Sequence, residues 1–404
     1  MMLTGRLRPL RHAWSMQGRR MLARRALSRM LEKLGAEDDI GSSNLLPSDV
    51  VDSGSLRLPF PARRPDFGQP LKIAWVSSPP SPGSGGHTTM FRMIEALEQA
   101  GHKCTLALYN PTDSDLADRV RIIRECWPRV RAEVRPLVAG LAGHDAAVAT
   151  AWQTAHALAK YGTNPMRRLY FVQDYEPYFY PHGARYALAE DTYHFGFRVI
   201  ALGKMVADRL AGESHVASDC VPFGCDTATY HLVESGPRNG VVFYAMPGTP
   251  RRGYSLNRMA LEQFNLAHPD VPIHAYGSGR PSDFSFPVTW HGRLRPDELN
   301  ALYSRTVAGL SMSFTNISLV AEEMLAAGCI PVVNDAEDAR ADLDNPFVAW
   351  TRPAPIAIAE RLGELLAAAD VEDRARQAAE SVRPDWSAAQ SGVLRVIENE
   401  TYGE

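Results

Sequence analysis

The sequence predicts an α/β protein that is built from two doubly wound parallel sheets. A buried strand, a Gly-rich loop, a helix and another strand follow one another over residues 71–109, which is a βαβ unit. The same order of elements begins again at residue 241, after the turn-forming residues 235–240. The 404 residues also match the length of two average domains. We therefore expect two α/β halves.

The first half is expected to form its sheet from short apolar runs that are bounded by turn-forming residues. Such runs are typical of buried strands. These runs cover residues 71–78, 103–109, 145–150, 168–173 and 198–202. After the first of them, Met90, Ile94 and Leu97 share one stripe at helical spacing. They predict a helix over residues 87–101.

The second half repeats this organisation. Its predicted strands cover residues 241–246, 272–277, 288–292, 307–313 and 329–334. The predicted helices between them cover residues 255–267, 296–304 and 319–327. Ligands of such sheets bind beyond the carboxyl ends of the strands, so the loops that follow the strands are the candidate sites.

The N-terminal segment is strongly basic. Residues 1–34 contain nine Lys or Arg and one acid, Glu32, which gives +8, whereas the whole chain carries −3. Apolar residues recur at helical spacing from Trp14 to Leu34 and predict a basic amphipathic helix. This helix either packs on the body of the protein with its arginines in water or is attracted to anionic lipid headgroups. Residues 35–70 are expected to be a linker, because they are acidic and then rich in Ser, Gly and Pro.

Composition narrows the class of protein. The net charge of −3 argues against general binding of nucleic acid. The five cysteines show neither a CxxC pair nor Cys/His ligand spacing, so a disulfide framework or a zinc site is not expected. No apolar run approaches the roughly 18 residues of a membrane span, and the N-terminus lacks the apolar core of a secretory signal. We expect a cytoplasmic protein.

A Gly-rich loop leads into the first predicted helix. In the stretch PGSGGHTT, residues 82–89, Gly85 and Gly86 stand where the first amides and the dipole of the helix favour an anion. A dinucleotide fingerprint would need a glycine at Thr88 and an acid at Asn110, so a dehydrogenase is disfavoured. A tight turn without a ligand is the other interpretation.

Two adjacent arginines follow the first strand of the second half. Arg251 and Arg252 precede Gly253 in the stretch PGTPRRGYSL, residues 247–256. Guanidinium groups match the oxygens of phosphate in a two-pronged contact. The loop is interpreted as a phosphate site, and a solvated basic loop is the alternative.

Polar and aromatic residues meet at the end of the strand that covers residues 168–173. In the stretch FVQDYEPYFYP, the amide of Gln173 and the carboxylates of Asp174 and Glu176 stand among aromatic side chains. A strand's carboxyl end is where ligands bind in a parallel sheet. The alternative is a capped turn inside an aromatic cluster.

The stretch SFTNISLVAEEMLAAGCIPVV, residues 313–333, joins a polar loop, a helix and a buried strand. Glu322 and Glu323 lie on the helix. A carboxylate on a helix that follows such a loop can accept hydrogen bonds from the hydroxyl groups of a sugar. By spacing alone, the two glutamates are solvated helix residues.

These motifs together resemble the GT-B glycosyltransferases of glycosyltransferase family 4. Residues 72–106 are similar to the family's first nucleotide-sugar half, and residues 291–333 are similar to its donor-binding block. Within the family, the chain most resembles the WsaF-type rhamnosyltransferases, through residues 171–193 and the stretch TPRRGYSL. The resemblance covers roughly residues 70–395.

The resemblance implies a GT-B fold, in which two Rossmann-like domains face a central cleft. The expected parts are the basic helix and linker (1–70), the N-terminal acceptor domain (71–235), the C-terminal nucleotide-sugar domain (236–384) and a crossover helix that packs back on the first domain (385–404).

The resemblance also implies which residues bind the donor. Glu323 would bind the ribose hydroxyl groups, and Arg252 would contact the diphosphate. Two positions depart from the family's pattern, because Thr315 replaces a glutamate and Met246 replaces an arginine. The phosphate contact of that arginine is then missing or is made by Arg251. The expected donor-binding residues are Gly85, Gly86, Arg251, Arg252, Gly292, Leu294, Thr315, Asn316, Ser318, Leu319 and Glu323.

The resemblance places the reaction centre at the aromatic stretch. Gln173 and Asp174 stand where many family members have a histidine, as in the rhamnosyltransferase subgroup. A carboxylate near the anomeric carbon can stabilise oxocarbenium character or orient an acceptor hydroxyl group. Glu176 is the competing carboxylate. No metal is expected, and the DSD triplet at residues 113–115, which resembles a metal motif of the other glycosyltransferase fold, is discounted.

The function that the resemblance implies is a retaining, metal-independent glycosyltransferase without a cofactor. Its expected donor is the nucleotide sugar dTDP-L-rhamnose, and its expected acceptor is a glycan or lipid-linked glycan of cell-surface polysaccharide synthesis. Contact with the anionic inner face of the membrane is expected through residues 1–34. The alternative is a catalytically weak glycan- or nucleotide-binding protein on the same fold, which Met246 and Thr315 favour. A sugar-nucleotide epimerase is a third interpretation.

Overall fold

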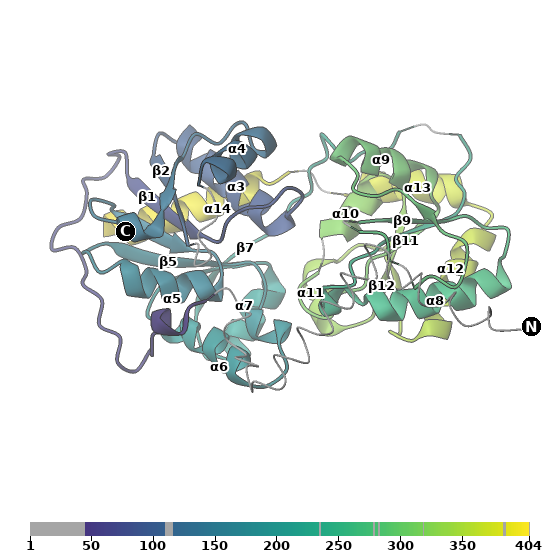
Figure 1. Cartoon of the computed structure of the whole chain (residues 1–404). Coiled ribbons are helices and arrows are strands. Elements are labelled where there is room, and N and C mark those ends of the chain that lie inside the picture. The colour runs from purple at the N-terminus through teal and green to yellow at the C-terminus, as the bar shows by residue number, and fades with distance from the viewer. Residues whose placement is uncertain are drawn as a thin grey trace, which may run out of the picture.

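The computed structural model contains two α/β domains that are joined by two chain crossings (Figure 1). It describes residues 45–109, 116–233, 236–277, 279–281, 283–317, 319–382 and 385–403. The helix expected over residues 1–34 and the triplet at residues 113–115 lie outside these ranges. The predicted fold class, two doubly wound α/β domains, is confirmed.

The first domain is built on a parallel sheet in the order β3-β2-β1-β4-β5-β6-β7. Its strands are β1 (Lys72–Ser77), β2 (Lys103–Leu108), β3 (Glu133–Pro136), β4 (Ala146–Ala149), β5 (Arg167–Val172), β6 (Arg198–Leu202) and β7 (Ser218–Val221). The search for apolar runs predicted all of these strands except β3 and β7. Those two strands form the edges of the sheet and are only partly buried, so they contain polar residues and no long apolar run.

Helices cover both faces of this sheet. They are α3 (Gly85–Gln99), α4 (Leu116–Cys126), α5 (Trp152–Tyr161), α6 (Ala184–Asp191) and α7 (Lys204–Gly212). Helix α3 begins two residues before its predicted start, because the Ser84 hydroxyl caps it by accepting a hydrogen bond from the N–H of His87. Its predicted stripe of Met90, Ile94 and Leu97 is buried in the core.

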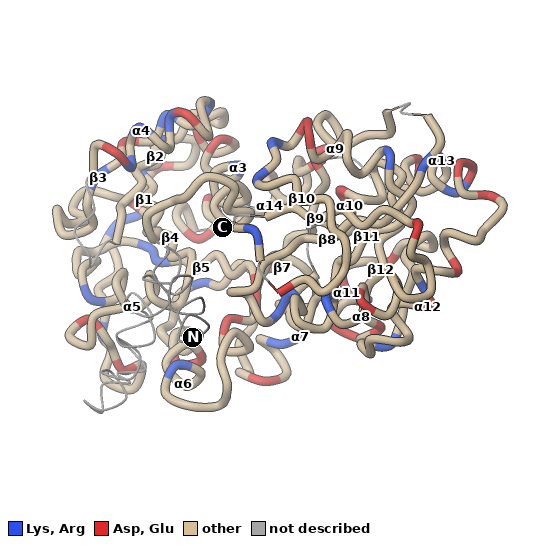
Figure 2. Tube along the Cα trace, turned by 45° about the vertical axis from the view of Figure 1, so that its right-hand side comes forward, with Lys and Arg blue, Asp and Glu red and all other residues tan. Residues whose placement is uncertain are grey.

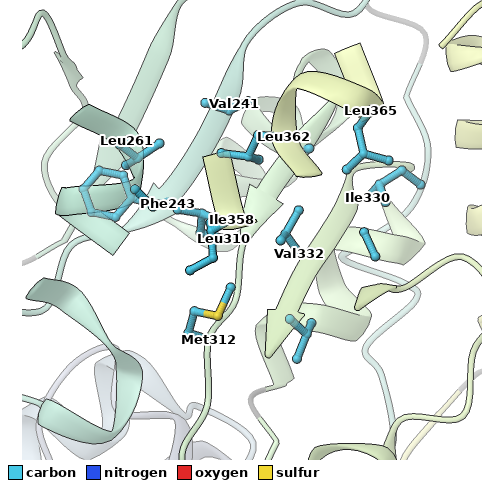
Figure 3. Close-up of a cluster of buried hydrophobic side chains, with 14 of the residues drawn as sticks. Val241, Phe243, Leu261, Leu310, Met312, Ile330, Val332, Ile358, Leu362 and Leu365 are labelled. Carbon is cyan, nitrogen blue, oxygen red and sulfur yellow. The ribbon is translucent and has the colours of Figure 1, made fainter. Parts of the chain in front are cut away.

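The second domain contains a parallel sheet in the order β10-β9-β8-β11-β12-β13. Its strands are β8 (Val241–Tyr244), β9 (Ile273–Tyr276), β10 (Thr289–Trp290), β11 (Ala308–Leu310), β12 (Ile330–Asn334) and β13 (Ala349–Thr351). Its helices are α8 (Tyr254–Ala267), α9 (Pro296–Arg305), α10 (Leu319–Ala326), α11 (Glu337–Asp342), α12 (Pro355–Ala367) and α13 (Val371–Ser381). In the core, Phe243, Leu310 and Val332 of the sheet pack with Leu261 of α8 and Leu362 of α12 (Figure 3).

The strand order places two loops of the second domain side by side. The direction of winding reverses between β8 and β11, and ligands bind at the carboxyl ends of the strands at such a point. The loop after β8, residues 245–253, carries Arg251 and Arg252, and the loop after β11, residues 311–317, carries Thr315. The topology therefore brings the two predicted donor loops together.

The chain returns to the first domain through α14 (Ser387–Glu398), which packs on α3 (Figure 1). Val393 and Ile397 of α14 share an apolar cluster with Ile94 of α3. The two chain crossings touch, because the N–H of Asp385 donates to the carbonyl of Cys225 at 3.2 Å.

Residues 45–60 pack along the first domain, although the composition of residues 35–70 predicts a linker. Asp49 is buried and accepts hydrogen bonds from the hydroxyl groups of Tyr109 and Tyr161, at 2.7 and 3.0 Å. The N–H of Val51 donates to Nδ1 of His156 at 3.1 Å. Burial lowers the pKa of His156 to about 4, so the ring is neutral and can accept this bond. The polar composition of the segment conceals these buried contacts, because their partners are distant in the sequence.

A contact between the two domains lies between α7 and α11. The Asp342 carboxylate of α11 accepts hydrogen bonds from the N–H groups of Lys204 and Met205 at 2.5 and 2.8 Å. It thereby caps the first turn of α7, a role that is usually filled by a residue of the helix's own segment. Arg209 of α7 pairs with Asp338 of α11 at 2.7 Å. These contacts stabilise the present orientation of the two domains.

Charged residues of both signs are interspersed over the two domains (Figure 2). Many pair on helix surfaces, as Arg121 does with Glu125 at 3.0 Å, and such exposed pairs contribute little to stability. Within the described ranges, no helix combines the length and the apolar character that crossing a bilayer requires.

Candidate active site

Asp174 lies between the two domains, two residues after the end of β5. Its buried carboxylate accepts hydrogen bonds from the Thr315 hydroxyl at 2.8 Å and from the Asn316 N–H at 3.1 Å. The side chain of Asn316 donates to the Gln173 carbonyl at 2.7 Å. Thr315 and Asn316 belong to the loop after β11, so these bonds tie the end of a first-domain strand to the second domain.

The loop after β8 brings Arg252 to the same place. Its Nη1 donates to the Ser313 hydroxyl at 2.6 Å and to the Asn316 carbonyl at 3.0 Å. Ser313 is itself fixed by Asn334 at the end of β12, through two hydrogen bonds of 2.7 Å. The guanidinium group of Arg252 is therefore held in one orientation by the backbone and side chains of the neighbouring loop.

Arg251 lies on the other side of Asp174. Its guanidinium carbon is 4.1 Å from the ring centre of Phe179, and its Nε is 3.9 Å from Oδ2 of Asp174. At 3.9 Å, Arg251 and Asp174 form an ion pair, but their atoms are too far apart for a hydrogen bond. Nε of Arg251 is buried and has no hydrogen-bond partner among the described residues. A buried donor of this kind can serve the oxygen of a bound anion.

The charges of this cluster do not balance. Burial raises the pKa of Asp174, whereas Arg252 and the Thr315 hydroxyl act in the opposite direction and favour the carboxylate. Burial lowers the pKa of Arg252 to about 10, and the charge of Asp174 partly offsets this effect. At neutral pH one carboxylate thus faces two guanidinium groups. The excess positive charge suits an anion such as a diphosphate.

The Gly-rich loop joins the cluster through Gln173. Nε2 of Gln173 donates to the carbonyl of Gly86 at 3.1 Å, and Gly85 is exposed at the start of α3. The next residue, His87, has its Nδ1 2.8 Å from the Ser84 hydroxyl, and burial lowers its pKa. Sequence reasoning did not single out His87, because one histidine at a helix start carries no spacing signal.

Glu176 faces the interior of the first domain. Its carboxylate accepts hydrogen bonds from the Trp152 N–H at 2.5 Å and from the Tyr170 hydroxyl at 2.6 Å. Its own N–H donates to the Tyr193 hydroxyl at 3.1 Å. Burial raises the pKa of Glu176 to about 7. All of these partners belong to the first domain, so they fix the turn that carries Asp174.

Glu323 lies in a second group, near the chain crossings. Burial raises its pKa to about 7, and the positive charge of Arg92 from α3 acts in the opposite direction. Arg92 pairs with Asp226 at 3.4 Å and lies 4.9 Å from the ring centre of Trp386. Nothing in the sequence points to Arg92, because an arginine on a predicted helix is usually solvated. Only the chain crossings bring its partners to it.

The remaining predicted donor residues lie around these two groups. Gly292 has a φ of 70°, a conformation that favours glycine, and its carbonyl accepts a hydrogen bond from the Gly277 N–H at 2.9 Å. Leu294 packs on an apolar cluster of the second domain, and Leu319 begins α10 and packs on a cluster of the first. Ser318 lies outside the described residues.

The described residues contain no group of three or more His, Cys, Asp or Glu side chains that is placed to hold a metal ion. All five cysteines are free thiols. The positive charges beside Asp174 are those of Arg251 and Arg252.

Comparison with known proteins relates both halves of the site to one family. Residues 129–204 match the N-terminal domain of the WsaF family, and residues 239–363 match its C-terminal domain. The chain is also 31% identical over 343 residues to the O-antigen biosynthesis protein RfbC of Myxococcus xanthus. This match covers 78% of the chain and 26% of RfbC, so the chain spans about a quarter of the length of that curated relative.

Solved structures share the two-domain architecture. Sucrose-phosphate synthase from Thermosynechococcus elongatus superimposes with a TM-score of 0.61 at 13% identity, covering 81% of this chain and 98% of that one. HepE of Anabaena, solved in complex with UDP-glucose, gives a TM-score of 0.57 at 15% identity and covers 82% of this chain and 95% of its own. At such low identity the likeness shows the fold alone, and that fold is GT-B.

Proposed function

Because the chain belongs to the WsaF family and carries both of its domains on a GT-B fold, we propose that it is a glycosyltransferase of polysaccharide biosynthesis. The observation that carries the proposal is the cluster between the domains, in which Asp174 faces Arg251 and Arg252. A carboxylate opposite two guanidinium groups suits the transfer of a sugar from a diphosphate to a hydroxyl group. The name of RfbC, an O-antigen biosynthesis protein, agrees with this assignment.

We assign the donor to the second domain. Its diphosphate would lie between Arg251, Arg252 and the amide groups at the start of α10, where the helix dipole favours an anion. Glu323 would accept a hydrogen bond from the hydroxyl group of the nucleoside's pentose, which in a deoxyribose is the 3′-hydroxyl alone. The sugar would then point toward Asp174 and Thr315. Following the resemblance to WsaF-type rhamnosyltransferases, the proposed donor is dTDP-L-rhamnose.

The proposed reaction retains the configuration at the anomeric carbon. The bond from this carbon to the diphosphate oxygen breaks, and its electron pair leaves with the diphosphate, whose charge the arginines balance. The acceptor oxygen forms the new bond on the same face, and its proton passes to a diphosphate oxygen. Asp174 would stabilise the positive charge that develops on the anomeric carbon and orient the acceptor. The scheme uses arginines and amide groups in place of a metal ion.

The proposed acceptor is a glycan or lipid-linked glycan that binds to the first domain. Tyr178, Phe179 and Tyr180 follow Asp174 and offer aromatic surface to sugar rings. The basic residues 1–34, outside the described ranges, are proposed to attract anionic lipid headgroups. Nucleic acid is not a proposed partner.

A panel of nucleotide sugars tests the proposed function. Calorimetry is expected to show the tightest binding for dTDP-L-rhamnose, and a new glycosidic bond is expected only when donor and glycan acceptor are both present. Binding without transfer to any acceptor would instead indicate a glycan- or nucleotide-binding protein. Isomerisation of the donor in the absence of an acceptor would indicate an epimerase. A protein that binds none of the panel would contradict the proposal.

Donor affinity is expected to rise with pH through Glu323. Because burial raises the pKa of this carboxyl to about 7, it is mostly protonated at pH 6 and mostly ionised at pH 8. The ionised form is the better acceptor for the 3′-hydroxyl group of the donor's deoxyribose. Calorimetry with dTDP-L-rhamnose should therefore show an affinity that increases about tenfold from pH 6 to pH 8. The intact sugar nucleotide is used because its diphosphate has no group that titrates in this range.

The variant Glu323→Gln should bind the donor with a flat pH profile. Glu322→Gln is the matched control, because burial also raises the pKa of Glu322 to about 7 and it lies on the same helix. The control should keep the pH dependence of the wild type. If the pH dependence of donor affinity survived in Glu323→Gln and disappeared in Glu322→Gln, Glu322 rather than Glu323 would contact the donor's pentose.

A further inference from the structure

The segment of residues 56–68 lies along the outer end of the first domain, away from the second domain, where Figure 1 draws it in purple. Two aromatic side chains of this segment, which we call the Phe strip, are open to solvent. Phe60 is 58% exposed and Phe67 is 74% exposed. Exposed large apolar side chains that are flanked by polar residues mark interaction surfaces. The proposed transfer reaction makes no use of this end of the molecule.

The Phe strip is fixed to the body of the protein. The ring of Phe67 packs edge-on against Tyr402 with 5.5 Å between the ring centres. The Tyr402 hydroxyl donates to the carbonyl of Gln69, directly after the strip, at 2.5 Å. The ring of Phe60 lies 5.0 Å from the guanidinium carbon of Arg167 at the start of β5. The two exposed rings are therefore presented by a held segment rather than by a free tail.

The Phe strip is also rich in positive charge. The strip contains Arg57, Arg63 and Arg64, all exposed, and one acid, Asp66. None of the three arginines forms an ion pair with a carboxylate among the described residues. In contrast, Arg167 at the same end of the domain is neutralised by an ion pair with Glu400 at 3.3 Å. The arginines of the strip thus keep their charge available to an external partner.

We propose that the Phe strip docks on an anionic lipid membrane. Aromatic rings partition into the interfacial region of a bilayer, and arginines beside them meet the phosphates of the headgroups. The basic residues 1–34, with a charge of +8, precede the strip in the chain. Within the strip, insertion of the aromatic rings and attraction of the arginines to the headgroups would act together in peripheral binding. This inference does not depend on the sugar-transfer activity.

Vesicle co-sedimentation of the full chain tests the proposal. Vesicles of phosphatidylglycerol mixed with phosphatidylcholine are compared with vesicles of phosphatidylcholine alone. The double variant Phe60→Ser/Phe67→Ser should lower the partition coefficient for anionic vesicles at least about tenfold, because each partly buried ring contributes a factor of several. The double variant Arg63→Ser/Arg64→Ser should lower it about fivefold per arginine, and added salt should abolish this difference.

Leu266→Ser is the matched control, because Leu266 is 72% exposed but lies on α8 of the second domain. It should bind anionic vesicles like the wild type. The arginine and Leu266 variants should keep the unfolding midpoint of the wild type, since they change only exposed side chains. The Phe double variant also loses the ring contacts with Tyr402 and Arg167, so its unfolding midpoint is recorded beside its vesicle binding. Unchanged sedimentation of the Phe double variant, or an equal loss in Leu266→Ser, would overturn the proposal. So would a dimer that dissociates in the Phe variant while vesicle binding stays the same, which would assign the strip to a second copy of the chain.

Discussion

Asp174→Asn is expected to lower the turnover number of sugar transfer by about 10²–10³ and to leave donor affinity near that of the wild type. The carboxylate belongs to the first domain, whereas the proposed nucleotide contacts come from the second. Its charge becomes important when positive character grows at the anomeric carbon, so the loss should fall on turnover rather than on binding. Removing a negative charge beside Arg251 and Arg252 also leaves these arginines free for the diphosphate. Asparagine keeps the shape of the side chain and one acceptor oxygen for Thr315 or Asn316.

Glu176→Gln is measured in parallel as the competing carboxylate. Glu176 accepts hydrogen bonds from Trp152 and Tyr170 inside the first domain. Its substitution should therefore lower the unfolding temperature, whereas the turnover number per folded molecule should change little. Donor affinity, turnover and thermal unfolding are recorded for both variants. Near-normal turnover in Asp174→Asn together with a folded but inactive Glu176→Gln would mean that the wrong carboxylate was chosen. Two active variants would show that the whole stretch is structural.

Arg252→Ala is expected to weaken the affinity for dTDP by about 10- to 150-fold. A charge-assisted hydrogen bond of this kind contributes on the order of 1.5–3 kcal/mol, which corresponds to that range. Ser313 and the Asn316 carbonyl hold the guanidinium group in place before any ligand binds, so little ordering of the side chain is needed on binding. Isothermal titration of dTDP into wild type and variant measures the change.

The same hydrogen bonds mean that Arg252→Ala also removes support from the loop after β11, so stability must be followed separately. Arg252→Lys keeps the charge but not the two-pronged geometry, and its affinity should fall between those of the wild type and the alanine variant. Arg361→Ala is the matched control, because Arg361 lies on α12 and pairs with Glu364 at 2.7 Å on the surface of the same domain. Equal affinity of wild type and Arg252→Ala would refute the phosphate assignment.

The sequence alone determined the architecture of the sheets and the residues of the loops at their ends. Buried parallel strands need nearly continuous apolar runs, and a run such as residues 71–78 is visible without any tertiary information. The same criterion found the central strands and missed β3, β7 and β13, whose edge positions tolerate polar residues. Arg251 and Arg252 were recognised because a loop after a buried strand has a predictable place at the edge of a parallel sheet.

Only the tertiary structure decided which of these loops meet and where each side chain points. Asp174 and Thr315 are 141 positions apart, and their hydrogen bond depends on how the two domains face each other. Glu176, two residues from Asp174, turns into the first domain toward Trp152 and Tyr170, which local spacing cannot reveal. Apolar periodicity indicates which face of one segment is buried. It does not indicate which other segments that face contacts. Hydrogen bonds and ion pairs between distant residues follow from strand order and domain packing, so the site could be assembled only in three dimensions.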